Sequence, residues 1–188
     1  MTIAGKFGVV VILATLSPLV PSVQATPRYV GAEKCKMCHN RKDQVNQYDI
    51  WSHSGHAKAF ETLATDKAKE FAAKAGVKGD PQKAPECLEC HVTGFGLDST
   101  HFAEGFPKES GVQCESCHGP GSDYKAPSIM STTKYASGRE AQHKLALGAG
   151  LIIPDEQTCI KCHNKRSPAF KGFVFKDYYE RIKHQYKR

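Results

Sequence analysis

The sequence predicts a mainly α-helical protein with extensive loops, folded as one small domain. Three observations lead to this class. A five-residue pattern, Cys-x-x-Cys-His, occurs four times in 188 residues and uses all 8 cysteines. The stretches between the copies alternate helical composition with Gly- and Pro-containing loops. The mean hydropathy is −0.46, which is low for a chain that must build its core from side chains alone.

The repeated pattern is typical of covalent haem attachment. Two thiols three positions apart add to the two vinyl groups on one edge of a porphyrin, and the following histidine binds the iron through Nε2. We therefore predict four covalently attached haem c groups. The attachment residues would be Cys35, Cys38, Cys87, Cys90, Cys114, Cys117, Cys159 and Cys162, and the proximal iron ligands His39, His91, His118 and His163.

Other uses of paired cysteines fit the pattern less well. Zinc ribbons and redox dithiols also use Cys-x-x-Cys, but zinc would not require a histidine directly after all four pairs. A disulfide framework is an alternative in an exported chain, but two-residue spacing would give short, strained loops.

The first 25 residues read as an export signal. Lys6 supplies the charge, residues 7–16 form a short apolar core, and Val23-Gln24-Ala25 resembles a cleavage site. The sequence thus predicts a signal peptide at 1–25, a tetrahaem cytochrome c domain at 26–188, and a periplasmic or extracellular protein. The apolar core is too short to span a bilayer, so we expect no transmembrane segment after cleavage.

The mature chain would have 163 residues, 188 less the 25 of the signal, or about 41 residues for each motif. This is too few residues to surround four macrocycles with a core of side chains. We therefore expect a single domain wrapped around four stacked haems. The formal charge of +7 falls to roughly +2 once the signal is removed and the haem propionates and irons are counted. This balance argues against nucleic-acid binding.

In the first half of the chain, the order of elements is as follows. Residues 33–41 carry the first motif in a short helical turn. Residues 43–63 have helical composition, with His53 and His56 three positions apart and therefore on one helix face. Residues 66–75 continue as an Ala- and Lys-rich helix, and 76–85 form a loop.

In the second half, residues 97–110 form a loop or short hairpin that contains His101. Residues 122–137 look irregular, and 138–147 are helical and carry His143. A basic aromatic tail at 170–188 places His184 on a terminal helix. The short interval between the second and third motifs predicts that their haems are neighbours.

Five histidines remain as candidates for the distal side of the irons: His53, His56, His101, His143 and His184. This is enough for four bis-histidine haems with one to spare. We therefore expect low-potential haem iron at most of these metal sites.

Three stretches resemble the tetrahaem cytochrome c-554 family. They are the first motif with Trp51 and His56-Ala57-Lys58-Ala59, the run Cys87–Gly96, and the run Gly111–Gly121. The resemblance covers the first three motifs well and the fourth more loosely. It implies a helical, loop-rich fold around stacked haems and a periplasmic electron carrier. In the family member from ammonia oxidisers the electron donor is hydroxylamine oxidoreductase.

The resemblance also implies ligands. His56 would be distal to the third haem, and His184 would supply a ligand near the C-terminus. The family's distal histidine shortly after Gly-Pro-Gly is missing from residues 122–130, and His143 is the nearest replacement. The family's second haem is five-coordinate, while His53 and His101 could close that site here.

The predicted function is electron transfer between redox proteins, among them a hydroxylamine oxidoreductase-like or other multihaem partner. Two alternatives belong to other classes. An enzyme would act on a nitrogen oxide at an open second haem, and a homo-oligomer or extracellular filament would share a histidine between subunits.

Overall fold

The structure is a computed structural model that describes residues 26–43 and 45–184. The predicted signal peptide at 1–25 lies outside the described residues. In the described part of the chain the secondary structure is helical, apart from a single parallel bridge between Tyr29 and Phe102. The mainly α, loop-rich fold class is thus confirmed.

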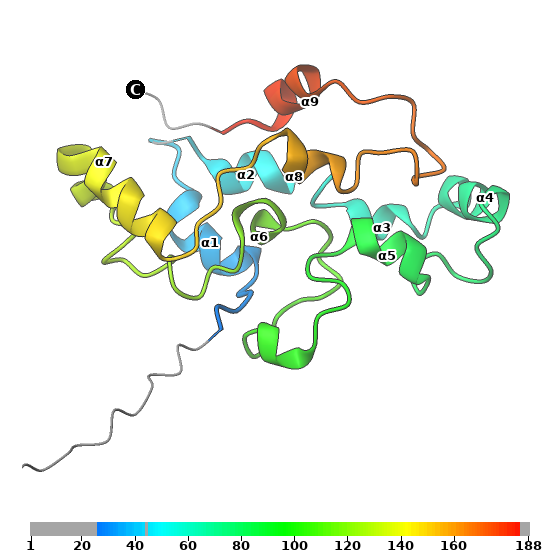
Figure 1. Ribbon diagram of the computed structural model, residues 1–188, viewed down its shortest axis with the longest axis horizontal. Helices are drawn as coiled ribbons and strands as arrows, with labels where there is room; N and C mark the ends of the chain where they lie inside the picture. Colours follow the sequence, from blue (N-terminus) through cyan, green and yellow to red (C-terminus); the bar gives the residue numbers. More distant parts are fainter. Residues whose placement is uncertain (1–25, 44, 185–188) are drawn as a thin grey trace, which may run out of the picture.

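The helices are short and are joined by long loops (Figure 1). In chain order they are α1 Ala32–His39, α2 Gln47–Ser52, α3 Ala59–Thr62, α4 Asp66–Lys74, α5 Pro85–His91, η1 Ser99–His101, α6 Cys114–His118, α7 Thr132–Gly148, α8 Glu156–Ile160 and α9 Phe175–Ile182. Helices α1, α2 and α6 lie at the centre, with α7 at one end and α4 at the other. Helix α9 lies at one edge, and α8 is drawn beside α2 below it.

Local sequence explains several helix starts. Thr65 caps α4 by accepting a hydrogen bond from Ala68 N at 3.2 Å. Asp155 and Thr158 form a reciprocal capping box at the start of α8. Pro85 occupies the first position of α5, where its missing N–H is not needed.

Two expected helices differ in the structure. The helix expected over 43–63 is wrong as one element, because α2 ends at Ser52 and α3 begins only at Ala59. His53 caps α2 and His56 lies in the turn beyond it, so the two histidines do not share a helix face. Residues 132–137, expected to be irregular, belong to α7, which is kinked at Gly138.

The other helical expectations are close to the structure. The helix predicted at 66–75 is confirmed by α4. The terminal helix is α9, but it ends at Ile182 because Lys183 adopts an extended backbone conformation. His184 therefore lies just beyond the helix that was expected to carry it.

The buried apolar core of the described residues is sparse. Its members are mostly small, such as Ala32, Ala59 and Ala84, and the largest fully buried side chains include the polar Gln113 and Glu115. A buried alanine side chain removes little apolar area from water. The observation agrees with the expectation that side chains alone do not fill the interior. No helix within the described ranges has both the length and the apolar character to cross a membrane.

Candidate functional site

The Cys-x-x-Cys-His patterns fall on single helical turns. In α1, α5 and α6 the motif histidine is the last helical residue. The fourth motif begins in α8 and continues its winding, since His163 N donates to Cys159 O at 3.0 Å. Positions i, i+3 and i+4 of a helical turn share one face. Each motif thus directs its two thiols and its imidazole to the same side of the backbone.

A cavity of about 240 Å³ lies between the first and third motifs. Its wall is mainly apolar and aromatic, with thiols and imidazoles among the lining groups. The residues of the motifs and the candidate ligands that line it are Cys35, His39, Cys114, Cys117, His118, His56 and His184, together with Trp51, Tyr124, Met130, Leu151 and Ile153. The thiols, imidazoles and apolar wall are the donor set and lining that a covalently attached haem requires.

The cysteines of different motifs lie against one another. The Cys35 thiol lies beside that of Cys114, and this neighbour together with burial raises the pKa of the Cys35 thiol. The Cys162 thiol likewise lies beside that of Cys90, and this neighbour together with burial raises the pKa of Cys162. All eight cysteines are free of disulfides. The first motif is therefore adjacent to the third, and the second to the fourth.

Two further relationships connect the pair of the first and third motifs with the pair of the second and fourth motifs. Burial raises the pKa of the Cys117 thiol and the nearby Cys159 adds to the rise, so the third and fourth motifs are also close. Thr93, two positions after the second motif, hydrogen-bonds Ser116 of the third at 2.7 Å. The second and third motifs are therefore neighbours in the chain's fold, as their short interval predicts.

Two of the predicted proximal histidines are oriented through Nδ1. His91 Nδ1 lies 2.7 Å from Ala59 O, and His118 Nδ1 lies 3.0 Å from Ile152 O. An Nδ1–H that donates to a carbonyl leaves Nε2 as the unprotonated nitrogen, free to bind a metal. Burial also lowers the pKa of His118, which favours the neutral, ligating form.

His56 is held from the third-motif side of the molecule. Val112 N donates to His56 O at 2.9 Å, and the Trp51 indole donates to Val112 O at 2.8 Å. A Cβ on Gly111, whose φ is +71°, would lie 2.7 Å from the carbonyl oxygens of His56 and Ala57. The glycine is thus required by the close approach of the two backbones. These contacts bring Trp51 and His56 together with the residues that precede Cys114.

The His56 ring faces the fourth motif. Its centroid is 5.9 Å from that of His163, with the planes at 77°. His163 stacks on Phe173 at 4.9 Å. Burial lowers the pKa of His56, with a smaller contribution from His163. The resemblance implied the third haem for His56, whereas its ring contact is with the histidine of the fourth motif.

His184 is the second candidate that reaches a motif histidine. Its ring centroid is 5.9 Å from that of His118, with the planes at 63°. Its Nδ1 lies 2.9 Å from Ile182 O, and it is also close enough to His39 to contribute to the lowering of the pKa of His39, behind burial. Although it lies past α9, His184 lines the cavity.

The remaining candidates lie elsewhere. His53 is exposed, with its Nδ1 2.8 Å from Asp49 O. His101 lies beside Asp98, 3.3 Å away, in η1. His143 is exposed on α7. The structure does not bring these three side chains into the cavity.

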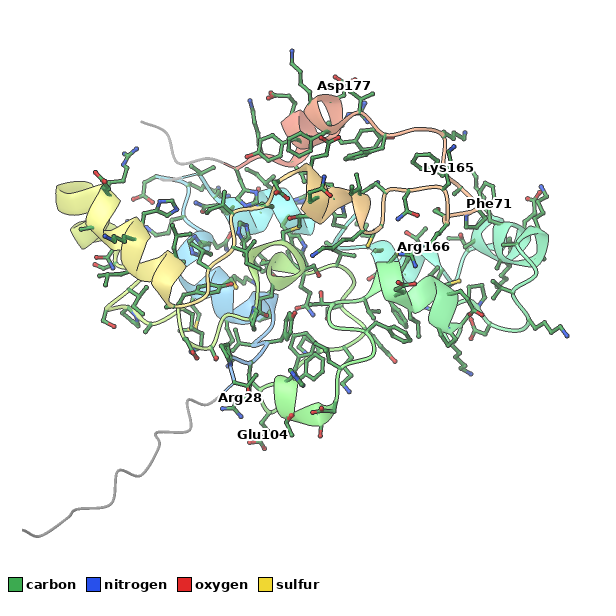
Figure 2. The ribbon with its side chains drawn as sticks, in the orientation of Figure 1. Arg28, Phe71, Glu104, Lys165, Arg166 and Asp177 are labelled. Atoms are coloured by element: carbon green, nitrogen blue, oxygen red, sulfur yellow. The ribbon has the colours of Figure 1, made fainter. Side chains whose placement is uncertain are left out.

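Sequence reasoning missed Gln113 and Glu115, which are buried on either side of Cys114. Positions within and before the motif read as spacers, and a glutamate there gives no sign that it is buried. The comparable glutamate of the second motif, Glu89, is half-exposed and forms an ion pair with Arg166 at 2.8 Å. Figure 2 shows Arg166 beside α5, reaching across from the segment after α8.

Comparisons with known proteins agree with these motifs. Residues 34–119 match the family described as cytochrome c554 and c-prime. The chain is 34% identical over 158 residues to a protein named cytochrome c-554 from Nitrosomonas europaea. That alignment covers 80% of this chain, which spans 64% of the relative's length. No solved structure matches.

Proposed function

We propose that this chain is a member of the cytochrome c-554 family and acts as an exported tetrahaem electron carrier, a proposal supported by the family match over residues 34–119 and by the 34% identity to one cytochrome c-554. The observation that carries the proposal is the arrangement of four Cys-x-x-Cys-His turns whose cysteines meet between motifs. A bound haem supplies an iron that takes up and releases one electron. Groups attached at adjacent motifs would be close enough together to pass electrons within one small domain.

The attachment residues of the proposal are the eight cysteines, and the proximal ligands are His39, His91, His118 and His163. Two distal ligands follow from the ring geometry. Two imidazole rings could hold one haem iron between them only if they are spaced widely enough for the metal. The His118–His184 and His56–His163 separations of 5.9 Å fit this arrangement. We therefore assign His184 to the third haem and His56 to the fourth.

The order of the electron path would differ from the order of the motifs in the chain. Cys35 meets Cys114, Cys117 is near Cys159, and Cys162 meets Cys90. By these cysteine contacts the path would run first, third, fourth, second, and the Thr93–Ser116 contact would also allow a direct step between the third and second haems. The first haem would lie at one end of the path, and a redox partner would dock near it.

The partners in this proposal are a donor and an acceptor protein in the periplasm or outside the cell. A hydroxylamine oxidoreductase-like or other multihaem protein is the donor that the family resemblance suggests. Support for export comes from the composition of residues 1–25.

The proposal is tested by producing the full chain together with a cytochrome c maturation system. Mass spectrometry should give the mass of the chain from Thr26 plus four haems, and the reduced pyridine complex should show four haem c per chain. The double variant Cys87→Ala with Cys90→Ala should contain three. Fewer than four haems in the wild type, or bound zinc in their place, would overturn the proposal.

A further inference from the structure

Two buried side chains beside Cys114 reach back to the start of the helix that carries the first motif. The Glu115 carboxylate accepts hydrogen bonds from Val30 N at 2.8 and 3.0 Å, from Gly31 N at 2.7 Å and from Gly121 N at 2.6 Å. Gln113 Oε1 accepts from Ala32 N at 2.8 Å. Both side chains are 1% exposed. The first turn of α1 is thus tied to the residues on both sides of Cys114.

The hydrogen bonds identify the ionised form of Glu115. Each carboxylate oxygen faces N–H donors, so a proton on either oxygen would oppose a donor instead of meeting an acceptor. Burial raises the pKa of the Glu115 carboxyl, and the N–H groups of Val30, Gly31 and Gly121 act against that rise. The hydrogen-bond partners are neutral backbone groups, so the site retains a net negative charge in a poorly solvated environment.

The charge of Glu115 lies beside both the first and the third motif. Glu115 follows Cys114 directly, and Cys35 Sγ is 3.9 Å from the carbonyl of Gly31, whose N–H the carboxylate binds. Burial raises the pKa values of Tyr29 and Tyr124, and the charge of Glu115 adds to both rises. The negative charge of Glu115 therefore acts on Tyr124, which lines the cavity, and on Tyr29.

The pair formed by the second and fourth motifs also contains a glutamate, but that glutamate has a different environment. Glu89 directly precedes Cys90, whereas Glu115 directly follows Cys114. The Glu89 carboxylate is half-exposed, and Arg166 Nη1 donates to its two oxygens at 2.8 and 2.9 Å. Water and the guanidinium compensate that charge. Each pair of motifs thus has one glutamate inside a Cys-x-x-Cys segment, and only the one at Glu115 is buried with neutral partners.

We propose that Glu115 lowers the reduction potentials of the first and third haems relative to the second and fourth. A ferric haem carries one more positive charge than a ferrous haem, so a buried anion nearby favours the ferric state. Electrons would then move from the first and third pair towards the second and fourth. The inference rests on the proposed function, because it assumes haems at all four motifs.

The test is a potentiometric titration of the holoprotein, followed by visible spectra and electron paramagnetic resonance. Glu115→Gln should shift two of the four haems to higher potential and leave the other two unchanged. Glu115→Asp keeps the charge and shortens the side chain, so it should destabilise the protein to guanidinium while those potentials shift less. Glu89→Gln is the matched control and should leave all four potentials close to the wild type.

The outcomes separate this inference from the proposed function. Haem content is measured first, and a wild type without four haems contradicts the proposed function itself. With four haems present, unchanged potentials in Glu115→Gln, or equal shifts in Glu115→Gln and Glu115→Asp, would overturn a role for the charge.

A second measurement covers the case in which Glu115→Gln does not mature. The wild-type holoprotein should have a lower reduction potential at the third haem, identified by its spectral change in His184→Ala, than at the fourth haem, identified in the same way in His56→Ala. The opposite order of these two potentials would overturn the inference.

Discussion

The imidazole rings of His118 and His184 have centroids 5.9 Å apart and planes at 63°, although one ring belongs to the third motif and the other lies beyond the last described helix. The Nδ1 atoms of both rings lie within hydrogen-bond distance of backbone carbonyls, of Ile152 and Ile182. When Nδ1–H donates in this way, Nε2 is left unprotonated on each ring. His184 was already a candidate ligand by the family resemblance, and this relationship pairs it with the third motif in particular.

Replacing His184 tests that assignment. His184→Ala should convert one low-spin ferric haem in four to a high-spin signal, because the iron loses its sixth ligand. The reduced variant should bind one more equivalent of carbon monoxide than the wild type. His143→Ala is the control, since His143 is exposed on α7, and its spectra should match the wild type. A change in His143→Ala without one in His184→Ala would reverse the two roles.

His56 can be tested against its near neighbour His53. His56→Ala should open one haem, since its ring lies 5.9 Å from that of His163. His53 is three positions away and 77% exposed, so His53→Ala should leave the low-spin spectrum unchanged. Electron paramagnetic resonance of the ferric proteins distinguishes the two. If both variants keep four low-spin haems, His56 is only part of the wall of the cavity.

Gly111 should be intolerant of a side chain. Gly111→Ala places a Cβ 2.7 Å from the carbonyl oxygens of His56 and Ala57 and requires a φ of +71°. We expect a loss of about 1–3 kcal/mol in the free energy of unfolding, measured by guanidinium titration, together with partial loss of one low-spin haem. Gly55→Ala is the control, because a Cβ there meets no atom within 4 Å. Equal stability of the two variants would contradict the close approach.

The stability of the protein should depend on pH through His56. Burial, followed by the effect of His163, lowers the pKa of His56 below its usual 6.5, so the folded state keeps it neutral at a pH where the unfolded chain binds a proton. The free energy of unfolding should therefore fall as pH decreases below about 6.5, by at most about 1.4 kcal/mol per pH unit for this one group.

The measurement is a set of guanidinium titrations between pH 7 and pH 5. His56→Ala should reduce the slope of unfolding free energy against pH, and His53→Ala should keep the slope of the wild type. An identical slope in all three proteins would show that His56 does not titrate differently in the folded and unfolded states.

Several elements could be predicted from the sequence because they depend on neighbouring residues. The α4 helix has a capping threonine and strong helix formers within nine residues. The interruption between α2 and α3 has a local signal that the helix expected over 43–63 did not take into account, because Ser54-Gly55 is a dipeptide typical of turns. The sequence alone could not show the tertiary contacts at this point, where His56 O accepts from Val112 N and Gly111 approaches closely. The local turn and these contacts both end the helix before Ala59.

The sequence by itself determined the four Cys-x-x-Cys-His turns and the family resemblance, because the two thiols and the imidazole that act together lie within five consecutive residues. Only the tertiary structure decided that the first motif meets the third and the second meets the fourth, which distant histidine faces which motif, and that Glu115 is buried with backbone partners. These relationships join residues far apart in the chain. They depend on how the long loops pack around a sparse core, and hydrophobic periodicity carries no signal for such packing.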